Sequence, residues 1–345
     1  MPFFSYRVVL LLLNIILLVL EFQTVTSRPT ETERVELWHK NVKYWPPRWH
    51  EHNESASYQA VQQAREEEIM NIPGSNERWE NWMQFVQGRM VPKFTPMGFK
   101  VVKTQAWIHE KLVNKVMKGV ERWDDLPLED DVGDAIYGPI SPKFVEMDGL
   151  DWEVIEELKE LHEEWSGMKL VATSAYGVRL YQNGSSLVMH HDKVHTHVIS
   201  SIVHIAHQYD NDSVPWPIQI EDHDGNMHSV SLQAGDMLHY ESAKCLHGRM
   251  QEFKGRYYGS IFLHYKPIEK SLWGYDVDQV IASVPPHWMD NVEEDKGSRW
   301  AGQAITVDSM AAAGAPPRMV LGQYVHSRVS QHANVPLQSS AHDEL

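Results

Sequence analysis

A short motif near the middle of the chain carries side chains that could bind a metal ion. His190 and Asp192 are separated by one residue in the segment YQNGSSLVMHHD, which runs from 181 to 192. Successive side chains of a β-strand alternate between its faces, so His190 and Asp192 would project together while His191 points away. They would be two ligands for one metal, and a third must come from another part of the chain.

A second motif supplies that ligand. The segment CLHGRMQEFKGRYY, from 245 to 258, contains His247 and, nine residues later, Arg256. Two histidines and one carboxylate are the ligand set of a non-haem iron(II) site with open positions. A bidentate 2-oxo acid and O2 could fill these positions, and the acid's far carboxylate needs a cation. Arg256 offers a bidentate fork, and Lys254, on the same face of the strand, is the alternative anchor.

The order of these features is more specific than the His-x-Asp triplet, which can arise by chance in a chain with 20 histidines. Short strand-like segments with a Gly-Asp turn separate the two motifs, and a basic residue follows the second. We interpret the other nearby histidines as surface or hydrogen-bonded core residues, not as ligands: His195, His197, His204 and His207.

This order resembles the iron(II)/2-oxoglutarate-dependent oxygenase superfamily, and within it the prolyl 4-hydroxylase-like branch. The pattern Y-x-x-G-x-x-Y-x-x-H-x-D of that branch is similar to the first motif here, which reads Tyr181-x-x-Gly184-x-x-Leu187-x-x-His190-x-Asp192. The turn and strand over 235–240 resemble the segment before the family's distal histidine. The resemblance covers about 170–267.

The resemblance implies a double-stranded β-helix with Fe(II) held by His190, Asp192 and His247. It also implies 2-oxoglutarate anchored by Arg256, with Tyr181 either contacting this cosubstrate or packing beside it. The reaction implied is hydroxylation of a C–H bond by O2, with 2-oxoglutarate converted to succinate and CO2 and ascorbate serving as the reductant.

Two departures from the family pattern concern substrate specificity. Leu187 stands where the family has a tyrosine that helps to hold the 2-oxoglutarate carboxylate. The basic residue is an arginine nine residues after the histidine, where collagen-type prolyl 4-hydroxylases usually have a lysine at ten. A peptidyl proline is therefore the first expectation for the substrate, with lysine or another residue behind it.

Charge and cysteine content limit the function further. The chain has 345 residues and a net charge of -16, with 47 acidic against 31 basic side chains, which argues against nucleic-acid binding. Cys245 is the single cysteine, so no disulfide can form within the chain. We expect no dependence of the fold on an oxidising compartment.

The two ends of the sequence indicate where the protein acts. An apolar run after Arg7 and small residues before Arg28 predict a signal peptide over 1–27, with a retained signal anchor as the alternative. The last four residues are HDEL, an address for return to the endoplasmic reticulum. We expect a lumenal protein without a stable membrane span, a retrieval receptor for HDEL and a secretory protein substrate. Three sequons could carry glycans, at Asn53, Asn183 and Asn211.

Helical apolar periodicity followed by short strand-like segments predicts an α+β protein: a double-stranded β-helix (jelly roll) with the preceding helices packed on it. Residues 28–95 form a Trp-rich arm, with one helix over 55–70. The oxygenase domain spans 96–268, with helices over 106–120 and 151–165, a surface loop over 126–142 and about eight short strands over 170–267. Residues 269–345 form an extension.

Two other functions remain open from the sequence. One is a catalytically inactive jelly-roll binding module of the secretory pathway. The other is a metal-dependent jelly-roll enzyme that does not use 2-oxoglutarate. The substrate surface could come from the Trp-rich arm or from the loop over 126–142.

Overall fold

The computed structural model describes residues 54–72, 75–129, 136–211 and 215–274. The predicted signal peptide and the HDEL terminus lie outside these residues. The helices, in chain order, are α3 (Ala56–Met70), α4 (Ser75–Met90), α5 (Ala106–Glu121) and α6 (Leu150–Ser166). The strands are β1 (Phe99–Lys103), β2 (Ile136–Tyr137), β3 (Lys143–Val145), β4 (Leu170–Tyr181), β5 (Ser186–His190), β6 (Ile199–Tyr209), β7 (Ile218–Glu221), β8 (Met227–Val230), β9 (Asp236–Tyr240), β10 (His247–Arg249) and β11 (Gly255–Pro267). Two short 3-10 helices lie at Trp123–Asp125 and Lys270–Leu272.

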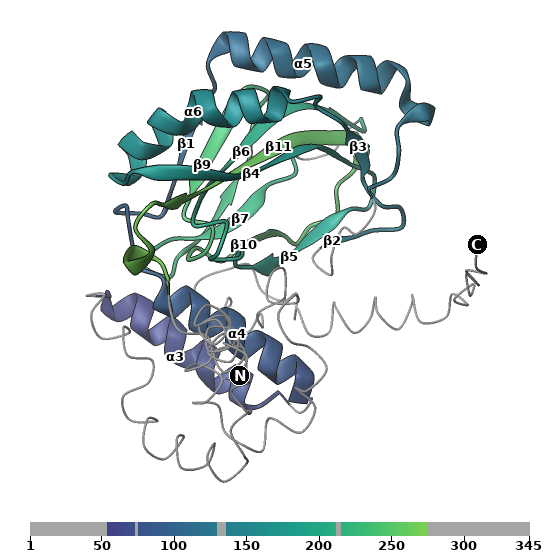
Figure 1. The fold of residues 1–345 in the computed structure, drawn as a ribbon. Coiled ribbons are helices and arrows are strands. Elements are labelled where there is room, and N and C mark those ends of the chain that lie inside the picture. The colour runs from purple at the N-terminus through teal and green to yellow at the C-terminus, as the bar shows by residue number, and fades with distance from the viewer. Residues whose placement is uncertain (1–53, 73–74, 130–135, 212–214, 275–345) are drawn as a thin grey trace, which may run out of the picture.

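The strands form two antiparallel sheets that face each other (Figure 1). The larger sheet has six strands in the order β1-β9-β6-β11-β4-β3, and the smaller has five in the order β2-β5-β10-β7-β8. From β4 to β11 the chain crosses repeatedly between the two sheets, which is the connectivity of a jelly roll. The predicted fold class and the eight-stranded core are confirmed.

Helices α5 and α6 cover the outer face of the larger sheet (Figure 1). On α5 the buried residues recur at every fourth position, which places one apolar stripe against the sheet: Ile108, Leu112, Val116 and Val120. The buried stripe of α6 includes Val154, Ile155 and Leu158. Both helices agree with the predicted ranges to within a residue, and the main hydrophobic core lies between them and the sheet.

Helices α3 and α4 lie on the opposite side of the molecule, next to β5 and β10 (Figure 1). Helix α3 matches the prediction, and its N-cap Ser55 accepts a hydrogen bond from the Tyr58 amide at 3.2 Å. Helix α4 was not predicted. Its buried positions include Asn81, Gln84 and Gln87, and this polar sequence conceals the periodicity that marks a helix packed by apolar contacts.

The described parts of the predicted surface loop over 126–142, residues 126–129 and 136–142, contain more paired structure than expected. β2 pairs with β5 through Ile136 and Leu187. Glu129 is only 5% exposed, and it binds the guanidinium of Arg179 from β4 through both carboxylate oxygens. The described residues of this segment therefore pair with strands of the jelly roll and do not simply cross its surface.

Candidate metal centre

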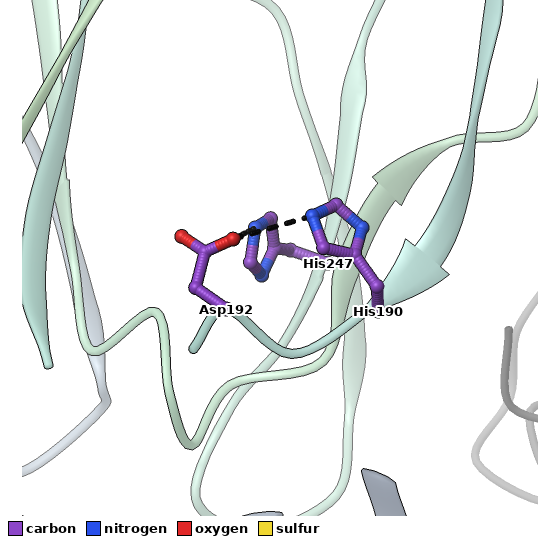
Figure 2. A group of neighbouring side chains, drawn as sticks. All are labelled: His190, Asp192 and His247. Atoms are coloured by element: carbon purple, nitrogen blue, oxygen red, sulfur yellow. Dashed lines mark ion pairs between the residues drawn. The ribbon is translucent and has the colours of Figure 1, made fainter. Parts of the chain in front are cut away.

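Backbone pairing brings the two sequence motifs together. β5 ends at His190 and β10 begins at His247, and these residues are direct partners in the antiparallel ladder of the smaller sheet. Asp192 follows β5, where its amide donates to the Ser242 carbonyl at 2.9 Å. The three side chains converge on one point between the sheets (Figure 2).

The distances within the group suit a shared metal ion. His190 Nε2 lies 3.4 Å, and His247 Nε2 lies 3.8 Å, from Asp192 Oδ1. One ligand atom from each residue lies within 4.8 Å of the others, and among the described residues only this histidine and carboxylate group has such spacing. The structure thus places the three predicted ligands side by side.

Both imidazoles are oriented by backbone carbonyls. His190 Nδ1 donates to the Val188 carbonyl at 2.8 Å, and His247 Nδ1 donates to the Cys245 carbonyl at 2.9 Å. Because a carbonyl only accepts, each ring carries a proton on Nδ1, and both Nε2 atoms face Asp192. A metal-binding histidine needs this tautomer.

The electrostatics of the group favour a cation. Burial by itself would raise the pKa of Asp192, but His190 and His247 lower it well below its usual range, so the carboxylate is ionised. Burial, and then the neighbouring His190, lower the pKa of His247 to about 4, so this ring is neutral. Asp192 Oδ2 is buried, and no donor within the described residues lies at hydrogen-bond distance from it. Two imidazoles beside a buried, ionised carboxylate fit the ligand set of Fe(II).

The other histidines near the motif lie where they were expected. His191 points away from the group, and its ring packs against Gly88 of α4, where an added Cβ would lie 2.6 Å from His191 Nε2. The four histidines interpreted as non-ligands are not part of the group: His195, His197, His204 and His207. Strand alternation therefore separates His190 from His191 correctly.

The predicted cosubstrate anchor does not lie inside the jelly roll. Arg256 is exposed, and its guanidinium carbon lies 5.1 Å from the centre of the Trp123 ring, on the side of α5. The pairing of β11 with β6 shifts between Gly255 and Tyr257, so Arg256 is the extra residue of a β-bulge. A bulge reverses the alternation of side chains, which turns Arg256 outward. The alternative anchor, Lys254, is exposed and paired with Glu252.

The interior holds a different arginine, which the sequence analysis missed. Arg249, the last residue of β10, is 3% exposed and lies two residues after His247. The alternation used for His190 and Asp192 could have found it, because residues two apart share a strand face. Tyr181 is buried in an aromatic cluster with Trp216, Phe253 and Tyr258, and its contact with a cosubstrate stays a prediction.

Comparison of the sequence with protein-family models finds no match, and comparison with curated proteins finds none either. Among solved structures, a prolyl-4-hydroxylase from Pseudomonas putida is 12% identical, with a TM-score of 0.38 over 50% of this chain and 94% of that one. A prolyl hydroxylase from Trichoplax adhaerens, in complex with a hypoxia inducible factor peptide fragment, is 11% identical, with a TM-score of 0.40 over 58% of this chain and 94% of that one. HygX from Streptomyces hygroscopicus, with nickel, 2-oxoglutarate and hygromycin B bound, is 12% identical, with a TM-score of 0.36 over 50% of this chain and 84% of that one. Likeness at this level concerns the fold and supports no argument about activity, so the function rests on the chain's own residues.

Proposed function

We propose that the protein is an iron(II)/2-oxoglutarate-dependent dioxygenase that hydroxylates a C–H bond. The observation that carries this proposal is the convergence of His190, Asp192 and His247, with both Nε2 atoms directed at an ionised carboxylate. Fe(II) held by these residues would supply the activation of O2, coupled to conversion of 2-oxoglutarate into succinate and CO2. The alternative without 2-oxoglutarate lacks a role for the buried Arg249.

The protein's own residues bind and orient the reactants. Asp192 supplies the negative charge that an iron(II) ion needs, and the Val188 and Cys245 carbonyls fix the two imidazoles. Tyr240 is buried beside the group, with its ring centre 4.8 Å from that of His247. The Tyr240 ring would help to exclude water from the reacting centre.

We further infer a substrate among secretory proteins, with a peptidyl proline as the first candidate. The apolar run at the start of the sequence and the terminal HDEL support residence in the lumen of the endoplasmic reticulum. There a retrieval receptor would return the protein, and ascorbate would keep the iron reduced. No helix in the described part of the chain is long and apolar enough to cross a bilayer.

Anaerobic titration of the full chain with Fe(II) tests the metal site, with Asp192→Ala as the disabling variant. Asp224→Ala is the matched control, because Asp224 is exposed. We expect iron binding by the wild type and the control, and its loss in Asp192→Ala. Succinate formation from 2-oxoglutarate should follow the same order. A wild type that neither binds iron nor forms succinate would favour the inactive binding module.

The substrate is tested by mass spectrometry of secretory proteins from cells with and without this protein. We expect peptides whose mass rises by one oxygen atom only when the wild-type chain is present. Expression of Asp192→Ala should leave these peptides unmodified. Modification on residues other than proline would keep the oxygenase and reject the prolyl assignment.

A further inference from the structure

Arg249 is held in an unusual position for a charged side chain. It is 3% exposed, and its guanidinium carbon lies 4.5 Å from the centre of the Trp216 ring and 4.6 Å from that of Tyr258. Arg249 Nη1 donates to the Trp216 carbonyl at 2.6 Å, and Nη2 donates to the Tyr258 hydroxyl at 3.3 Å. These two acceptors are uncharged, so they fix the guanidinium without neutralising it.

Other buried arginines of the chain have a carboxylate. Arg65 binds Glu221 with an Nη2 to Oε2 distance of 2.6 Å, and Arg179 binds Glu129. Arg249 forms no ion pair within the described ranges. A buried charge without a counter-ion lowers the stability of the folded protein. A site that retains such a charge is organised for an anionic ligand.

We propose that Arg249, and not Arg256, binds the far carboxylate of the 2-oxo acid. The proposal rests on the function proposed above and names the residue that selects the cosubstrate. His247 and Arg249 are two residues apart on β10, which places their backbones about 7 Å apart with both side chains between the sheets. This separation is comparable with the length of a short dicarboxylic acid that chelates the metal at its 2-oxo end.

The aromatic residues around Arg249 define the shape of this carboxylate site. Tyr181 and Tyr258 are fully buried, and the Tyr181 and Trp216 rings meet edge to face at 5.1 Å. A guanidinium has five N–H donors in a rigid fork, and the two bonds already made leave donors for a carboxylate. The rings hold the guanidinium in place, so binding of the acid loses little side-chain conformational entropy.

A binding experiment without turnover tests the assignment. The full chain is loaded with Fe(II) under anaerobic conditions and titrated with 2-oxoglutarate or with 2-oxobutyrate, which lacks the far carboxylate. Binding is followed by the visible charge-transfer band that forms when a 2-oxo acid chelates iron(II). The variants are Arg249→Met, Arg249→Lys and, as the matched control, Arg256→Met. Circular dichroism and thermal melting verify that each variant is folded.

The wild type should bind 2-oxoglutarate much more tightly than 2-oxobutyrate. In Arg249→Met we expect the Kd of 2-oxoglutarate to rise about 100-fold, with the Kd of 2-oxobutyrate nearly unchanged. Arg249→Lys keeps the charge but not the fork, so we expect a rise of about 10-fold in the same Kd. Arg256→Met should behave as the wild type.

The outcomes separate this inference from the proposed function. Loss of discrimination in Arg256→Met, together with an unchanged Kd of 2-oxoglutarate in folded Arg249→Met, would overturn the inference and leave the oxygenase intact. If Arg249→Met does not fold, Arg249→Lys decides, and an unchanged Kd of 2-oxoglutarate in that variant would reject the assignment. A wild type that forms no band with either acid would instead contradict the proposed function.

Discussion

Replacing Gln87 of α4 by methionine should weaken the metal centre without touching a ligand. Gln87 Nε2 donates to the carbonyl of Asp192 at 2.6 Å and to that of Ala243 at 3.2 Å. Its side chain therefore links the segment after β5, which contains Asp192, to the loop between β9 and β10, which leads to His247. Methionine preserves the volume and removes both hydrogen bonds.

The expected loss follows from these two bonds. A buried carbonyl left without a donor costs about 1 to 3 kcal/mol, and each carbonyl has a second lone pair, so we take about 2 kcal/mol for the pair of bonds. That corresponds to a fall in Tm of about 4 to 8 °C for a domain of this size. Loss of a residue that orients a metal ligand lowers metal affinity by about 10-fold or more.

The assay combines thermal melting with an anaerobic competition between the protein and a chelator for Fe(II). Gln63→Met is the matched control, because Gln63 is exposed on α3 and bonds only to Glu67 among described side chains. Gln87→Met should show both the lower Tm and the weaker iron binding. A lower Tm with unchanged iron affinity would refute the positioning role, and two unchanged values would refute the contact itself.

Three further predictions concern stability. Burial lowers the pKa of His162 to about 4 and that of His239 to about 2, so both folded-state values lie below the unfolded value near 6.5. In acid, the unfolded state therefore binds more protons than the folded state. We expect the free energy of unfolding to be retained above pH 6.5 and to fall by about 2 kcal/mol per histidine by pH 5. Denaturant titration of His239→Phe at pH 7 and pH 5 should show a smaller loss than the wild type, and an equal loss would contradict the assignment. Glu129→Gln leaves the partly buried Arg179 without its counter-ion, so chemical denaturation should show that the free energy of unfolding falls by about 3 kcal/mol. A change below 0.5 kcal/mol, which is usual for surface substitutions, would show that the ion pair is solvated. Removing iron with a chelator should lower the Tm of the wild type and not that of Asp192→Ala, because a ligand stabilises only the state that binds it; an equal shift in both would place the stabilising metal elsewhere.

Helix α4 is also the clearest limit of the sequence-based view. Its buried Gln84 accepts a hydrogen bond from the His191 amide at 2.9 Å, and the buried Lys244 donates to the carbonyls of Gly88 and Val91 at the end of the helix. These hydrogen bonds join α4 and its C-terminal end to residues more than 100 positions away in the chain. No periodic pattern records such partners, so the Trp-rich arm was predicted to contain one helix where the structure has two.

Local rules were sufficient for much of the remainder. The apolar stripes of α5 and α6 follow from helical spacing, and the β7–β8 hairpin follows from its Asp-Gly-Asn turn. The choice of His190 over His191 follows from strand alternation, which holds wherever a strand is regular. The convergence of His190, Asp192 and His247 could be predicted because His190 ends β5, Asp192 follows it and His247 begins β10.

The placement of Arg249 and Arg256 shows what the sequence alone could not decide. Alternation along β11 would turn Arg256 inward, but Gly255 lies so close to β6 that an added Cβ would be 2.3 Å from the Gln208 carbonyl oxygen. The register shifts there by one residue, Arg256 turns toward Trp123, and the interior charge is left to Arg249. The sequence determined the residue types and their periodic placement. Only the tertiary structure decided which arginine lies inside the jelly roll, because a bulge depends on how two distant strands pack against each other.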